Sequence, residues 1–129
     1  MALDLAAEEG FAVTVVPART SADQVRAFVA DEANRSPNLR FHSVIFCSDS
    51  TREEETRTAL QRLLGDRVEL SMEFGGLDDG FLPYRAEEAK KFLIDKTKSL
   101  SPDLVFTHSR SDLHQDHRFV SEITYQVLR

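Results

Sequence analysis

The chain has 129 residues, of which 16 are basic and 22 are acidic, and its formal net charge is −6. This length suits one domain with a single modest core, and an acidic balance without a basic block argues against a nucleic-acid backbone as partner. No apolar run approaches the ~20 residues that a membrane-spanning helix needs.

Two features of the sequence concern the cellular compartment. The first residues carry acidic side chains where a signal peptide carries basic ones, so the sequence does not indicate export. The single cysteine, Cys47, has no partner for an internal disulfide and fits a reducing compartment. We therefore expect a cytoplasmic protein.

The first part of the chain alternates between helical and β-rich patterns. Residues 2–9 predict a short helix that ends at Gly10, and residues 11–16 predict a strand that Pro17 terminates. Ser21 begins a second helical pattern with an apolar stripe.

The middle of the chain repeats this alternation. Residues 41–47 contain a continuous apolar run and predict a buried strand. Thr51 with Glu54 three residues later reads as a capping box, which predicts a helix from Thr51 to Gly65. A third strand is expected at residues 67–72.

The last part of the chain completes the pattern. A loop rich in glycine and aspartate is expected at 73–83, a helix at 86–100 and a strand at 103–107. A final helix should begin after Asp112, with apolar positions at helical spacing from Phe119 to Leu128. Strands that alternate with helices of this length predict a three-layer, Rossmann-like α/β domain with a mostly parallel sheet.

This fold class predicts where a site would lie. In an open α/β sheet, ligands bind outside the carboxyl ends of the strands. Four loops should meet there, at 17–24, 48–52, 73–83 and 108–117. A sheet of only four strands should also keep an exposed edge, which favours a homodimer.

The most unusual stretch follows the fourth predicted strand and reads Asp-Leu-His-Gln-Asp-His-Arg. His114 and His117 are three residues apart and therefore share one face of a helical turn. Asp112 with Gln115 three residues later reads as the helix N-cap and its capping box. Imidazole is the commonest metal ligand, and a ligating histidine usually donates its other N–H to a carboxylate. Asp112 and Asp116 are placed for that role. The alternative is that these aspartates and histidines only cap and solvate the start of a helix, which is the commoner meaning of an H-x-x-H pattern taken alone.

This stretch, from Asp112 to Arg118, resembles the closing motif of the PIG-L/LmbE-like zinc-dependent deacetylases, D-x-H-[PQ]-D-H-R. The likeness extends backwards through the Pro-Asp-Leu-Val-Phe-Thr run at 102–107. It is strongest over residues 41–129 and implies a single domain over residues 1–129.

Two other loops resemble the same family. Asp49 and Arg52 match the start of the helix after its second strand, and the Asp-Gly-Phe-Leu run that begins at Asp79 matches its D-G-x-L loop. The resemblance implies that these three residues bind substrate. For Arg52 an alternative stays open, since an arginine beside three glutamates is often part of a solvated ion-pair face.

The resemblance also implies a reaction and its participants. Zn²⁺ would be bound by His117, and the substrate would be a small-molecule amino-sugar conjugate of the N-acetylglucosamine type. His114 would act in catalysis, its imidazolium stabilising the oxyanion that forms at the acetamide carbonyl. Asp116 would act with it by orienting a motif histidine, although the same residue could simply be a favourable charge in the first turn of a helix.

The sequence departs from the family at the first loop. The family's His-Pro-Asp-Asp motif, which supplies two metal ligands and the general base, is absent. The corresponding loop, 17–23, offers only Asp23 as an anionic ligand. His108 ends the fourth predicted strand and could face the site, whereas His42 lies inside the second strand and is expected to be packed.

This gap limits the expected activity. A catalytic zinc site normally has three protein ligands, and the sequence offers His117 with Asp23 and His108 as weak helpers. We therefore expect a zinc-dependent deacetylase impaired by the loss of its first metal motif. The alternative is a non-catalytic, sugar-binding or truncated member of the same fold.

Restoring the missing motif tests this alignment. The combined change Arg19→His, Thr20→Pro, Ser21→Asp and Ala22→Asp should strengthen zinc binding, because it adds an imidazole and two carboxylates to the first loop. Calorimetric titration with zinc measures the change, and the same four new residues in scrambled order are the control. Equal affinity of the restored and scrambled variants would show that this loop is not aligned with the family's.

Overall fold

The computed structural model describes residues 11–16, 39–64 and 68–128. The helices expected at 2–9 and after Ser21 lie outside these residues. None of the helices in the described ranges combines the length and apolar character that a membrane crossing requires. The elements, in chain order, are β1 (Phe11–Val16), β2 (Leu39–Cys47), α2 (Ser50–Leu64), β3 (Glu69–Leu77), the 3₁₀ helix η2 (Leu82–Arg85), α3 (Ala86–Thr97), β4 (Leu104–Thr107) and α4 (Gln115–Val127).

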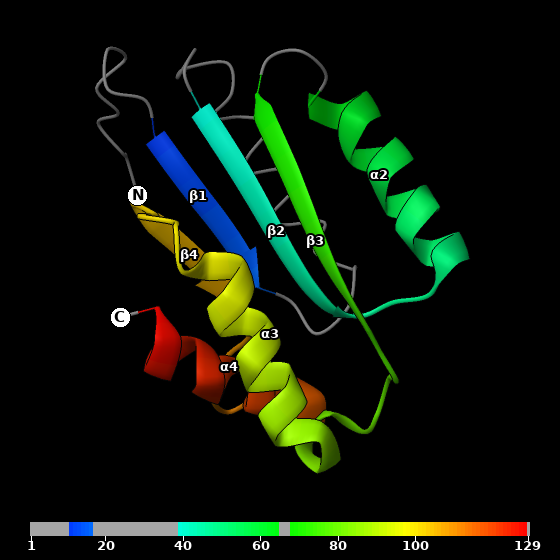
Figure 1. The fold of residues 1–129 in the computed structure, drawn as a ribbon, viewed down its shortest axis with the longest axis vertical. Coiled ribbons are helices and arrows are strands. Elements are labelled where there is room, and N and C mark those ends of the chain that lie inside the picture. The colour runs from blue at the N-terminus through cyan, green and yellow to red at the C-terminus, as the bar shows by residue number, and fades with distance from the viewer. Residues whose placement is uncertain (1–10, 17–38, 65–67, 129) are drawn as a thin grey trace.

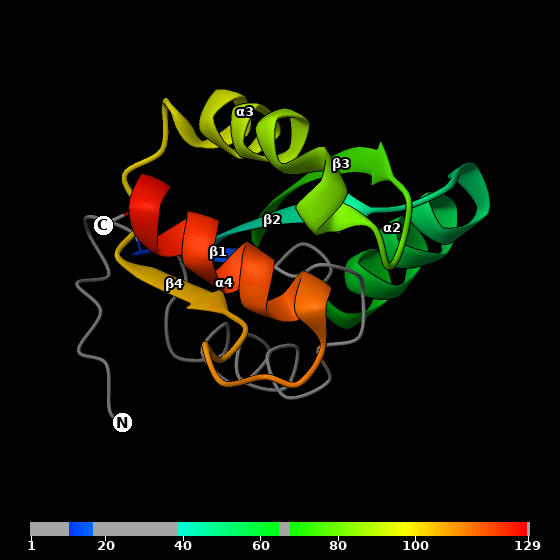
Figure 2. The ribbon, with the colours of Figure 1, turned by 90° about the horizontal axis from the view of Figure 1, so that it is seen from below.

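The four strands form one parallel sheet in the order β3-β2-β1-β4 (Figure 1). Helices α3 and α4 lie on one side of the sheet, and α2 lies on the other side beside β3 (Figure 2). The predicted α/β class with a parallel sheet is confirmed. Since all strands run in the same direction, their carboxyl ends lie at one edge of the sheet.

The core is built around β2, which is buried on both faces as a central strand of a parallel sheet should be. Phe41 and Ile45 occupy one face of its pleat, and Val44 and Phe46 occupy the other. The second face packs against α3 and α4 in a single apolar cluster, whose fully buried members include Val44, Phe46, Leu82, Ala89, Leu93 and Val120.

Strand β3 is longer than the sequence predicts. The expected strand at 67–72 and loop from 73 become one strand that continues to Leu77. A Cβ atom on Gly75 would lie 2.7 Å from the carbonyl oxygen of Phe46, so the absent side chain lets β2 and β3 stay in contact there. The pairing shifts register between Ile45 and Cys47, which places Leu77 opposite Cys47.

Two helix boundaries also differ from the predictions. Helix α2 begins at Ser50, and its cap is the Asp49 carboxylate, which accepts a hydrogen bond of 2.9 Å from the Arg52 N–H. The predicted Thr51–Glu54 capping box is therefore wrong. Helix α3 ends at Thr97, short of the predicted residue 100.

The close approach at Gly75 predicts a stability defect. In Gly75→Ala the new methyl group would press on the Phe46 carbonyl, and overpacking of this kind typically costs about 1–3 kcal/mol in the free energy of unfolding. Urea denaturation measures the cost. Glu55→Ala, an exposed position in α2, is the control and should change stability by less than about 0.5 kcal/mol. Equal midpoints for the two variants would contradict the packing argument.

Candidate metal centre

Three of the four histidines of the chain gather where β4 ends and α4 begins. The ring of His117 stacks on that of His108, with centroids 4.0 Å apart and planes 6° from parallel. Its other neighbour is His114, with a centroid distance of 4.4 Å and an angle of 15°. The fold therefore brings together the two motif histidines and the one that follows β4.

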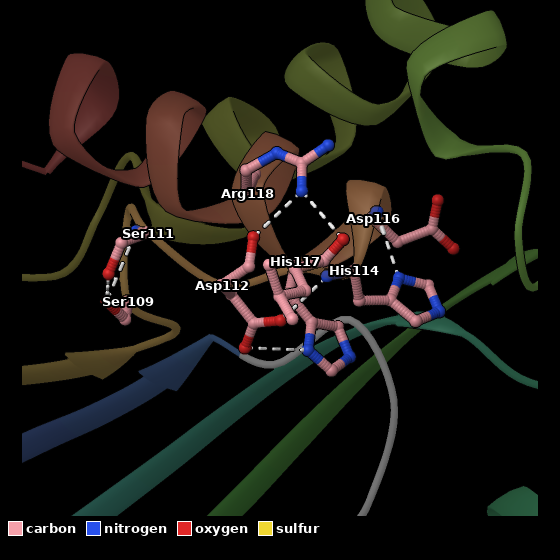
Figure 3. A network of polar contacts seen from close by, with 8 residues as sticks. Ser109, Ser111, Asp112, His114, Asp116, His117 and Arg118 are labelled. Atoms are coloured by element: carbon pink, nitrogen blue, oxygen red, sulfur yellow. Dashed lines mark hydrogen bonds and ion pairs between the residues drawn. The ribbon is translucent and has the colours of Figure 1, made fainter.

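Asp112 holds two of these histidines with one carboxylate (Figure 3). One oxygen accepts a hydrogen bond of 2.9 Å from the backbone N–H of His114, and the other lies 3.2 Å from Nδ1 of His117. The backbone N–H of His114, followed by the His117 ring, lowers the pKa of the Asp112 carboxyl below its usual value. Asp112 thus orients His117, as expected, but the predicted helix-cap role is wrong.

The N-cap of α4 is His114. Its Nδ1 accepts a hydrogen bond of 3.1 Å from the backbone N–H of Asp116. Asp112 does not serve as the cap because one of its carboxylate oxygens accepts from the backbone N–H of His114 and the other pairs with the His117 ring. Gln115 does not complete a capping box either, since its side-chain amide donates to the carbonyl of Gly80 at 2.7 Å.

For the neutral form of each ring, these contacts assign opposite tautomers to the two motif histidines. A backbone N–H can only donate, so Nδ1 of His114 is an acceptor and the ring proton lies on Nε2. A carboxylate can only accept, so Nδ1 of His117 carries the proton and Nε2 keeps its lone pair. Nε2 of His117 is buried and has no hydrogen-bond partner among the described residues. One ring therefore presents a donor and the other presents a ligand atom.

The guanidinium of Arg118 fixes the turn that carries these groups. Its Nη1 donates to the backbone carbonyls of Asp112 and Leu113, at 2.8 and 2.7 Å (Figure 3). Carbonyls held in this way keep the chain closed over the first turn of α4. The arginine at the end of the motif thus holds the backbone of the candidate metal centre in place.

Asp116 is completely buried, and its carboxylate points away from the His117 ring (Figure 3). It accepts hydrogen bonds from the backbone N–H groups of Gly80, at 2.6 Å, and Leu82, at 3.2 Å. The Leu82 side chain is itself part of the core. Asp116 therefore ties the loop after β3 to α4, a contact that the sequence pattern did not reveal, while its backbone N–H holds His114.

Two groups of side chains could hold a metal ion. In the first, His108, Asp112 and His117 each offer one ligand atom, and these atoms lie within 4.8 Å of one another. Burial, with the neighbouring His117 ring next in importance, lowers the pKa of His108 to about 4, so this ring is neutral at ordinary pH. Neutral imidazole and carboxylate are zinc ligands, and three of them match the number in catalytic zinc sites. The first group fits zinc.

The second group consists of Cys47, Asp79 and Asp116. The buried thiol of Cys47 lies 3.7 Å from the carbonyl oxygen of Asp78 and donates towards it. Because the carboxylate of Asp116 already accepts two backbone N–H bonds, this group serves as the anchor of the loop after β3. The sequence alone gave no sign that Cys47 lies beside this loop.

The predicted substrate-binding residues lie at the same edge of the sheet but have differing surroundings. Asp49 and Arg52 follow β2 and are exposed, with an ion-pair distance of 3.9 Å between them. Asp79 is exposed in the loop after β3. Asp23 lies outside the described residues. Ser48, which sequence reasoning missed, joins these parts: its hydroxyl donates to Glu53 and accepts from the N–H of Gly76.

The fourth histidine stands apart from the stack. His42 lies in β2, and its Nδ1 pairs with the hydroxyl of Ser71 on β3. Burial lowers the pKa of His42. The expectation that this residue is packed within the sheet agrees with these contacts, and His42 provides a control for experiments on the other three.

The domain is of the parallel α/β class, in which ligands bind at the carboxyl ends of the strands, and imidazole and carboxylate groups, which can serve as zinc ligands, gather there. The sequence matches the family model described as PIG-L, GlcNAc-PI de-N-acetylase, over residues 7–128. The chain therefore belongs to this family, whose members are deacetylase-type enzymes that are generally metal-dependent and act on sugar substrates. No curated protein matches the chain.

The tautomer assignment can be tested directly by nitrogen NMR of the histidine rings. In mildly alkaline buffer without added metal, His114 should show its proton on Nε2 and His117 on Nδ1, because their hydrogen-bond partners are a donor and an acceptor respectively. The Asp112→Asn variant, which removes the charged acceptor, should alter the His117 pattern and leave that of His42 unchanged. A proton on Nδ1 of His114 would contradict its role as the cap of α4.

Proposed function

We propose that the protein is a zinc-dependent amidohydrolase that removes the acetyl group from N-acetylglucosamine-type conjugates. The observation that carries the proposal is the pair of opposite tautomers in one family motif. His117 presents a lone pair that has no partner in the part of the chain that the structure describes, and His114 presents a donor beside it. The family description, a de-N-acetylase of an N-acetylglucosamine conjugate, supports the substrate class.

Each residue of the motif would have a separate role in the reaction. His117 would hold the ion, with Asp112 fixing the ring and increasing its basicity. Zinc, when bound, supplies Lewis acidity at the amide carbonyl and makes a nucleophile available at neutral pH. The Nε2–H of His114 would donate to the oxyanion that develops on the carbonyl oxygen, and the neutral ring suffices for this.

Substrate contacts are proposed at the rim of the same edge. Asp49, Arg52 and Asp79 carry polar groups suited to sugar hydroxyls, and all three are exposed to solvent. The carboxylate of Asp49 already caps α2, so its remaining oxygen would make the contact. The single cysteine fits a reducing compartment and supports a cytoplasmic setting for this reaction.

The reaction should be slow. The family's first motif, with its general base, is absent, and a positioned base typically contributes about 10²–10⁴-fold to the rate. Asp112 and Asp116, the carboxylates of the motif, are already bound to a histidine and to backbone amides. Neither is poised to take a proton from water.

A second candidate function, sugar binding without turnover, rests on the same observation. A site with a metal ligand and an oxyanion donor but no base can still bind an acetamide and its sugar hydroxyls. The two functions share a ligand and differ only in whether acetate is released.

Release of free amine from an N-acetylglucosaminyl-inositol conjugate distinguishes them. With added zinc we expect slow release, on the order of 10²–10⁴-fold below a deacetylase with a complete motif, and complete loss on chelation. His117→Ala should abolish it because the ion loses its ligand, whereas His42→Ala should retain it. Binding of the conjugate without amine release would favour the second function, and neither binding nor release would refute both.

A further inference from the structure

The histidine that follows β4 is not part of the family motif but lies against it. His108 lies outside the Asp-x-His-x-Asp-His pattern, yet its ring stacks directly on that of His117. Asp112 lies between them in sequence and binds His117. The three side chains offer ligand atoms within 4.8 Å of one another. All three are partly buried, and all lie on the segment that leads from the end of β4 into the first turn of α4.

We propose that His108, Asp112 and His117 form a complete three-ligand site for a divalent metal ion, so that this one segment replaces the ligands that the family takes from its first loop. The presence of a metal rests on the proposed function. The new element is the identity of the residues that complete its coordination. Two imidazoles and one carboxylate are a ligand set that catalytic zinc sites use.

The distances allow the site to close. Around a tetrahedral zinc ion with bonds of about 2.0–2.1 Å, ligand atoms lie roughly 3.4 Å apart. The present separations are up to 4.8 Å, so closure requires movements of about an ångström or more. Asp112 accepts its hydrogen bond from Nδ1 of His117, and it cannot keep this bond and also reach an ion bound at Nε2 on the far side of the same ring. Closing the site therefore replaces this hydrogen bond by coordination, while Arg118 continues to hold the turn that carries Asp112.

The movement falls on the stacked rings. The lone pairs of an imidazole lie in the plane of its ring, and two planes only 6° from parallel do not converge on one ion. One ring must therefore turn about its Cβ–Cγ bond. That torsion has a broad energy well in histidine, so the turn is accessible without backbone change. Metal binding should consequently break the stack between His108 and His117.

Zinc titration of the full chain tests the proposal. We expect one ion bound per chain by calorimetry, and a nitrogen-dominated cobalt spectrum when cobalt replaces zinc. His108→Ala should weaken zinc binding by at least about 100-fold, since losing a ligand exceeds the 10–100-fold effect of losing a supporting hydrogen bond. His108→Phe keeps a ring for the stack but has no ligand atom, and should show the same loss. His42→Ala is the matched histidine control.

A second measurement does not depend on affinity. Zinc should shift the ring resonances of His108 and His117 together, as the stack opens, and leave those of His42 in place. In His117→Ala the His108 resonance should no longer respond to zinc at the concentration that saturates the wild type.

The outcomes separate this proposal from the proposed function. If both His108 variants bind zinc as tightly as the wild type while Asp23→Ala or His117→Ala does not, the site is completed elsewhere and only the present proposal is overturned. If no variant differs because the wild type binds no zinc, the metal-dependent function fails as well. Loss of zinc in the His108 variants with retention in Asp23→Ala confirms the site.

Discussion

The geometry of the metal centre depends on one buried carboxylate. Asp116 has no exposed surface, and removing a carboxylate from water costs on the order of several kcal/mol. Two charge-assisted hydrogen bonds from the backbone of the loop after β3 offset this cost, and the N-terminus of α4 adds a favourable field. Because the N–H of the same residue holds His114, the loop and the His114 ring cannot be displaced independently.

Asp112 plays the complementary part on the other side of the turn. It binds the N–H of one motif histidine and the ring of the other, and Arg118 closes the backbone over it. The two aspartates of the motif therefore do different work. Asp116 connects the site to the core, whereas Asp112 sets the orientation and tautomer of the ring that would bind metal.

The stacking of His108 on His117 affects how the two rings could bind a metal ion in a chain without the family's first motif. The rings of His108 and His117 lie 4.0 Å apart, and burial, followed by the neighbouring His117 ring, lowers the pKa of His108 to about 4. In the same arrangement the lone pairs of the two rings do not point to a common position. Coordination of an ion by both rings therefore requires that the stack opens. The ligand residues of such a site are already close together, but their rings are not yet oriented for coordination. The free energy needed to reorient them lowers the expected metal affinity.

Much of this protein could be predicted from local sequence. The continuous apolar run in β2, the helical spacing after Gln115 and the alternation of elements indicate a parallel α/β domain, because side-chain periodicity reports local conformation directly. The histidines and aspartates after β4 indicate the place of the site for a different reason. In a parallel α/β fold the carboxyl ends of the strands lie at one edge of the sheet, and ligands bind there.

Other features were decided only by tertiary contacts. Gly75 and Gly76 read as a loop, yet β3 continues through them because the carbonyl of Phe46 lies against Gly75 from a neighbouring strand. Asp112 has the side chain of a helix cap, but His117 and the N–H of His114 engage its oxygens, and the cap passes to His114. Asp116 finds its partners 34 and 36 residues earlier in the chain. Propensity and spacing encode the conformation of a segment, whereas competition for a hydrogen-bonding group is settled by whichever partners the folded chain brings within reach.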